Sequence, residues 1–117
     1  MAVEIQSTDI EKTSLLLKLL GDKTRLKMVK LLETDDFCVC EFVEIFGISQ
    51  PAISQHIRKL KDAGMVTESR KGQWVFYSLN QSGESAELMM ALLKFLPDQQ
   101  GIAAELEKQG KRIHCKK

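Results

Sequence analysis

Residues 47–64 read GISQPAISQHIRKLKDAG, and this stretch decides the fold. Ser49 is a favoured helix N-cap, and Pro51 follows in the first turn, where its missing N–H costs nothing. Gly64 is a stop signal. The apolar residues between them recur at helical spacing: Ile53, Ile57 and Leu60. The pattern therefore predicts a helix from Ser49 to Gly64 with one buried stripe.

A second helix is expected directly before this one. It starts at Asp35 or Asp36 and runs through Phe46, and Gly47 provides the stop. Two helices separated by so tight a break match the helix-turn-helix, whose second helix enters the major groove of DNA.

Two short strands are expected after the helix that ends at Gly64. They cover residues 65–70 and 73–79 and form a hairpin with a basic tip. Further amphipathic helices are expected over residues 7–21, 22–33 and 84–96. This order predicts a mainly α protein with a small β-hairpin, a winged helix-turn-helix.

The helices expected over residues 7–21 and 84–96 are too rich in leucine for a small core to cover. We therefore expect these two helices to pair across a two-fold symmetric homodimer. The winged domain with its dimerisation helices is assigned to residues 1–100. Residues 101–117 form a C-terminal tail in which one possible set of helical turns is seen at Ile102, Ala103 and Leu106.

Charge is distributed unevenly, although the formal net charge is only +1. Five basic and two acidic residues lie within residues 49–75, against four acidic and no basic residues within 35–46. Positive charge thus gathers on the unit expected to read DNA.

Individual contacts to double-stranded operator DNA follow from this placement. In the helix from Ser49 to Gly64, amide and hydroxyl side chains on the outward, N-terminal part can read base edges: Gln50, Ser54 and Gln55. Other side chains are better placed for phosphates: Ser49, Arg58, Lys59, Lys71 and Gln73. His56 flanks the apolar stripe and is expected to hold the helix and not to bind metal.

Composition bounds the remaining function classes. A chain of 117 residues that is 44% hydrophobic and 28% charged suits one soluble domain. No apolar run approaches the roughly 18 to 20 residues of a membrane span, and the first residues lack a signal-peptide pattern. We therefore expect a cytoplasmic protein without a membrane partner.

Cys38 and Cys40 are too close in sequence to staple a fold, so reduced, metal-binding thiols are the better interpretation. Side chains two residues apart on an ideal helix point about 200° apart. One ion could then join both sulfurs only if the first turn unwound, which would couple binding to the helix-turn-helix. A helix N-terminus should also lower the pKa of these thiols. The alternative is that both cysteines are ordinary small apolar residues without a binding role. An enzymatic role has no support, because the sequence holds no C-x-x-C motif and no base near the cysteines.

Three runs of sequence resemble the ArsR/SmtB family of metal-responsive repressors. They are LGDKTRLKMVKLLE (20–33), DDFCVCEFVEIFGISQPAISQHIRKLKDAGMV (35–66) and RKGQWVFYSLN (70–80). The C-V-C pair at Cys38 to Cys40 looks like the thiolate box of the arsenic-sensing and cadmium-sensing branches. The resemblance implies a dimeric repressor that releases operator DNA when metal binds.

Arsenic-type sensing, by As(III) or Sb(III), is favoured within this resemblance. The zinc-sensing branch uses Asp and His on its last helix, but residues 84–96 contain neither, and no cysteine precedes Cys38 as the cadmium branch would require. The arsenic-type box often has a third cysteine where this chain has Val43. Cys115, water or a small thiol could complete the site. Sensing of Cd(II), Pb(II) or Zn(II), or thiol oxidation, stays open as an alternative.

Overall fold

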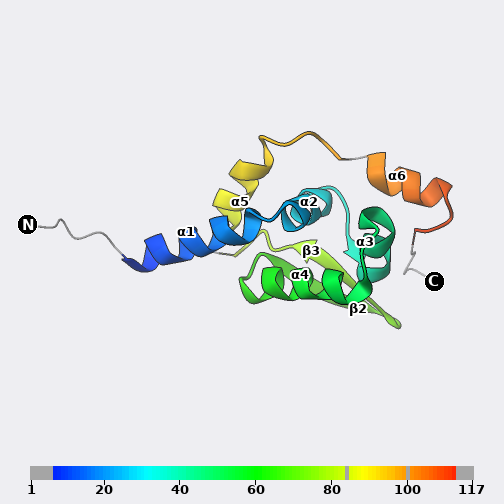
Figure 1. The fold of residues 1–117 in the computed structure, drawn as a ribbon, viewed down its shortest axis with the longest axis horizontal. Coiled ribbons are helices and arrows are strands. Elements are labelled where there is room, and N and C mark those ends of the chain that lie inside the picture. Colours follow the sequence, from blue (N-terminus) through cyan, green and yellow to red (C-terminus); the bar gives the residue numbers. More distant parts are fainter. Residues whose placement is uncertain (1–6, 84, 100, 113–117) are drawn as a thin grey trace, which may run out of the picture.

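The computed structural model describes residues 7–83, 85–99 and 101–112. It is a winged helix-turn-helix of helices around a small antiparallel sheet, as predicted (Figure 1). The elements are α1 (Ser7–Leu20), α2 (Lys23–Leu32), β1 (Phe37–Cys38), α3 (Val39–Phe46), α4 (Gln50–Asp62), β2 (Val66–Lys71), β3 (Trp74–Leu79), α5 (Ala86–Leu93) and α6 (Gly101–Lys108). Within the described residues, no helix is long and apolar enough to span a bilayer.

Three helix ends lie where the sequence signals place them: the starts of α2 and α4 and the end of α3. The Asp22 carboxylate accepts hydrogen bonds from the backbone N–H groups of Thr24 and Arg25, at 2.9 and 3.1 Å, and so caps α2. Ser49 Oγ likewise accepts from the Ala52 N–H at 3.3 Å at the start of α4. Gly47 ends α3 with φ of 68°, a left-handed conformation that glycine adopts without steric cost.

The hairpin of β2 and β3 turns at Gly72, whose φ is 63°. A third strand was not predicted: β1 pairs with the other edge of β3, so that β3 is central. Phe37 lies opposite Tyr77, and Cys38 lies opposite Phe76.

The prediction that the third helix starts at Asp35 or Asp36 is therefore wrong. Pairing with β3 holds Phe37 and Cys38 extended and buries both, so the helix cannot begin before Val39. The Asp35 carboxylate, instead of serving as a helix cap for α3, binds Arg112. Long-range pairing thus outweighs the local capping signal.

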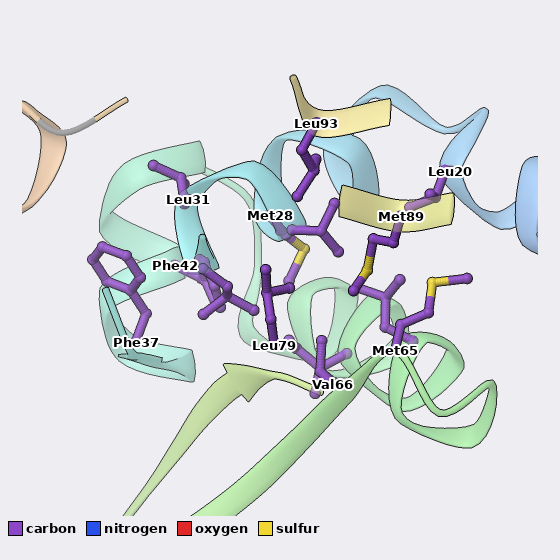
Figure 2. Close-up of a cluster of buried hydrophobic side chains, with 14 of the residues drawn as sticks. Leu20, Met28, Leu31, Phe37, Phe42, Met65, Val66, Leu79, Met89 and Leu93 are labelled. Carbon is purple, nitrogen blue, oxygen red and sulfur yellow. The ribbon is translucent and has the colours of Figure 1, made fainter. Parts of the chain in front are cut away.

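The core fills the space between the helices and the sheet. Its fully buried side chains come from β1, α2, α3, α4, α5 and the start of the wing, and Figure 2 shows part of this cluster. Met28, Phe42, Ile53, Leu60, Met65 and Met89 are among them. Phe42 stacks at ring-centroid distances of 5.5 Å from Phe37 and 5.9 Å from Phe46, and so joins β1 to α3.

Two segments near the C-terminus differ from expectation. The helix expected over residues 84–96 spans only Ala86–Leu93, and Glu84 itself lies outside the described residues. Gly101–Lys108 forms the complete helix α6, with Leu106 buried, where the sequence suggested one possible set of turns in a tail. Figure 1 shows α6 beside α3, at the opposite end of the molecule from the start of α1.

Replacing Phe42 with alanine should lower the free energy of unfolding by about 3–5 kcal/mol, because Phe42 is fully buried and its loss leaves a cavity beside Phe37. Phe42→Leu keeps most of the volume and should cost less than about 1.5 kcal/mol. Urea unfolding at one fixed protein concentration measures both. Equal losses in the two variants would contradict this description of the core.

Candidate nucleic-acid interface and thiol site

The outward face of α4 is formed as predicted. Ile53, Ile57 and Leu60 are buried beneath the helix. All six residues proposed for DNA on or beside this helix are exposed: Ser49, Gln50, Ser54, Gln55, Arg58 and Lys59. A polar and basic surface is thus available to a partner over the length of the helix.

The wing supplies a second exposed element. Lys71 and Gln73 flank Gly72 at the hairpin turn, and both are exposed. In Figure 1 the hairpin projects from the body as an arm. Lys61 Nζ lies 3.0 Å from Glu68 Oε1, an ion pair that joins the last turn of α4 to β2. The helix and the wing are therefore connected side chain to side chain.

His56 fixes α4 to the rest of the domain. The Arg25 guanidinium approaches His56 Nδ1 at 3.1 Å, and its Nε donates to the Leu19 carbonyl at 2.7 Å. One side chain thus connects the end of α1, the first turn of α2 and the middle of α4. This contact agrees with the expectation that His56 holds the helix.

The two thiols lie in different surroundings. Cys38 is the last residue of β1 and the N-cap of α3, with an extended backbone and only 2% of its surface exposed. Cys40 is in the first turn of α3 and is exposed. The prediction that both cysteines belong to one regular helix is wrong, because strand pairing withdraws Cys38 from it.

Burial also reverses the expected reactivity of Cys38. Removal of the sulfur from water raises the pKa of this thiol to about 12. A hydrogen bond from the Glu41 backbone favours the thiolate, but it does not compensate for burial, and the nearby Glu41 charge raises the pKa further. The expectation of a pKa lowered by the helix N-terminus is wrong for Cys38.

Glu41 and Arg112 surround Cys38, and the sequence analysis missed both. The fully buried Glu41 accepts a hydrogen bond from the Cys38 backbone N–H at 3.0 Å. Its Oε2 lies 3.3 Å from Arg112 Nη1. The spacing C-x-x-E, read as a capping box, could have placed the N-cap at Cys38. Nothing local points to Arg112, which is 71 residues from Glu41 in the sequence.

The described residues supply two thiols but not a complete metal site. Among them, no three or more His, Cys, Asp or Glu side chains are grouped so as to hold a metal ion. Cys115, the third ligand suggested by the sequence, lies outside the described residues. The two cysteines fit part of a thiolate site for a soft ion.

The chain is similar to known proteins in sequence and in fold. Residues 22–68 match the family model described as bacterial regulatory protein, arsR family. The arsenical resistance operon repressor of Bacillus subtilis is 37% identical over 78 residues, which cover 66% of this chain and 74% of that protein. The chain belongs to the arsR family. The predicted family resemblance is thereby confirmed.

Two further proteins are similar to this chain, one in sequence and one in structure. The arsenic resistance transcriptional regulator ArsR1 of Pseudomonas putida is 40% identical over 82 residues, which cover 69% of this chain but only 62% of that protein. The crystal structure of the transcriptional repressor BigR from Xylella fastidiosa superimposes with a TM-score of 0.67 at 31% identity, over 77% of this chain and 88% of that one. Because the family is one of bacterial regulatory proteins, this chain is a regulator and not an enzyme, as the sequence predicted.

Alkylation of Cys38 by iodoacetamide should accelerate about tenfold per pH unit from pH 7 to 9, because only the thiolate reacts and its raised pKa keeps that fraction small. In a Cys40→Ser, Cys115→Ser variant, Cys38 is the one remaining cysteine of the three, so mass spectrometry follows its alkylation alone. A Cys38→Ser, Cys115→Ser variant gives the reference rate for the exposed Cys40. A plateau in the Cys38 rate below pH 9 would show that its pKa is not raised.

Proposed function

We propose that this chain is a cytoplasmic, homodimeric repressor that binds double-stranded operator DNA and releases it when As(III) or Sb(III) binds Cys38 and Cys40. The observation that carries the proposal is the position of Cys38 between two parts of the DNA-binding unit. It is paired with Phe76 on the central strand of the wing, and it is also the residue from which α3 starts.

This position connects the thiols to the DNA-binding surface. Cys38 is buried and Cys40 is exposed, so an ion can bind both sulfurs only when the surroundings of Cys38 open to admit it. Movement at Cys38 acts on β3 through strand pairing and on α3 through its N-cap. Since α3 is the helix that leads into α4, either route changes how the DNA-reading elements are presented. We propose this route in place of the expected unwinding of the first helical turn, because Cys38 is not part of a regular helix.

The DNA contacts are assigned to the exposed face of α4 and to the wing. Gln50, Ser54 and Gln55 are proposed to read base edges. The remaining exposed residues are proposed to bind phosphates: Ser49, Arg58, Lys59, Lys71 and Gln73. A two-fold dimer is supported by α1, on which Ile10, Leu15 and Leu17 are about half exposed.

The inducer is proposed from ligand chemistry together with the printed names of the relatives. Thiolates select soft ions, and two of the relatives described above are named for resistance to arsenic. As(III) takes three thiolates, so the third position falls to Cys115, to water or to a small cellular thiol. Cd(II), Pb(II), Zn(II) or oxidation of the same cysteines is the alternative signal.

Arsenite should release the protein from a DNA duplex selected for tight binding out of a random library. Cys38→Ser and Cys40→Ser should each keep DNA affinity within about threefold and abolish release, because both sulfurs hold the ion. Fluorescence anisotropy, with arsenite, antimonite, cadmium, lead, zinc and peroxide titrated separately, measures this. Release by arsenite in both serine variants would exclude the site, and release by peroxide alone would favour oxidation. Cys115→Ser, if its arsenite affinity is unchanged, excludes the tail ligand.

Arg58→Ala should weaken DNA binding and flatten its dependence on salt. Each phosphate contact contributes about 0.9 to the slope of log Kd against log salt, so loss of one contact per protomer removes about 2 from the slope of a dimer. Anisotropy titrations between 50 and 300 mM salt give that slope. Lys108→Ala, on α6, is the matched loss of a positive charge and should leave it unchanged. An unaltered slope in Arg58→Ala would remove this residue from the interface.

A further inference from the structure

The C-terminal segment 101–112 is docked on the part of the chain that carries the thiols. Leu106 of α6 is buried, and Ile102 and Ala103 pack against the core. Beyond α6, Lys111 Nζ lies 2.9 Å from Glu44 Oε1 on α3. Arg112 follows, and its side chain is only 12% exposed. The segment is therefore held by apolar contacts at the helix and by charged contacts at its end.

Arg112 contacts the chain on both sides of Cys38. Its Nη2 donates to Asp35 Oδ1 at 2.8 Å and to the Asp36 carbonyl at 3.0 Å. The guanidinium carbon lies 4.5 Å from the centre of the Phe37 ring, a cation–π contact. Nη1 lies 3.3 Å from the buried carboxylate of Glu41, an ion pair without hydrogen-bond geometry. One side chain thus spans the segment 35–41.

We propose that Arg112 is a positioning residue that braces this segment in its inducer-free conformation, so that the chain must release Arg112 before Cys38 and Cys40 can hold one ion. The brace connects Asp35 and Asp36, which precede the cysteines, to Glu41, which follows them. An ion can reach the buried sulfur of Cys38 only when its surroundings open, and Arg112 holds the segment on both sides of that sulfur. Each contact of Arg112 opposes that change.

The energetic direction follows from linkage. A ligand shifts a conformational equilibrium only by its differential affinity for the two states. Contacts made only in the braced state lower the apparent affinity for any reagent that needs the open state, and their removal raises it. The arsenite part of this inference rests on the proposed function, whereas the exposure of Cys38 does not.

Alkylation of Cys38 tests the brace without any inducer. In the full-length Cys40→Ser, Cys115→Ser protein at pH 7.5, Arg112→Ala should accelerate the reaction with iodoacetamide by about tenfold or more, since several charge-assisted contacts are lost. Arg112→Lys, which keeps the charge but not the planar fork, should give an intermediate rate. Lys111→Ala is the matched control, because its ion pair with Glu44 is exposed on both sides.

A second pair of variants covers the case that Arg112→Ala, in which the buried Glu41 loses its ion pair with Arg112, does not fold. Asp35→Asn removes the 2.8 Å ion pair at a carboxylate that is 43% exposed, and should accelerate alkylation by about threefold. Asp36→Asn is its control, because Arg112 contacts the carbonyl of Asp36 and not its carboxylate. Local opening should show little dependence on urea, whereas opening by global unfolding should follow the full urea dependence.

Unchanged Cys38 rates in Arg112→Ala and Asp35→Asn would overturn the brace, as would equal acceleration in Lys111→Ala and Asp36→Asn. An increase that follows the urea dependence of global unfolding would also overturn it. In the protein that keeps all three cysteines, Arg112→Ala should lower the arsenite concentration for half-release of DNA by a similar factor. If arsenite releases no DNA at all while the alkylation rates differ as expected, the proposed inducer fails and the brace stands.

Discussion

The pairing of Phe37 and Cys38 with β3 is the constraint on which the rest of the structure depends. It makes the wing a three-stranded sheet, sets the residue at which α3 can begin, and buries a thiol at the junction. Phe37 then stacks on Phe42, which ties the strand to the first helix of the helix-turn-helix. Two residues of strand therefore join the helix-turn-helix to the wing.

Local sequence signals were sufficient to predict the helix ends and turns that they mark. Asp22 and Ser49 cap helices through hydrogen bonds within three residues, and Gly47 and Gly72 take the left-handed conformations that their turns need. The residues that make these interactions lie within a few positions of one another in the sequence. A two-residue strand has no periodicity of its own, and β1 exists only because β3, far along the chain, offers an edge. The same limit hid Arg112, whose partners lie more than 70 residues away.

The candidate sites show the same division. A helical stripe of Ile53, Ile57 and Leu60 determines which face of α4 points outward, so its exposed residues could be named from the sequence. The surroundings of a thiol depend on tertiary packing. Cys38 and Cys40 are chemically identical and almost adjacent, yet one is buried and the other faces solvent. Sequence spacing identified the pair, but it could not show that strand pairing gives the two sulfurs different access.

The contact between Arg25 and His56 bears on how an operator must be built. Arg25 reaches the last turn of α1 through the Leu19 carbonyl and the middle of α4 through the imidazole. In a two-fold dimer held together by α1, this side chain relates the symmetry axis to the recognition helix. In the proposed complex with DNA, a contact that never touches DNA would thus help to set the separation of the two α4 helices, and with it the number of base pairs between the centres of two half-sites.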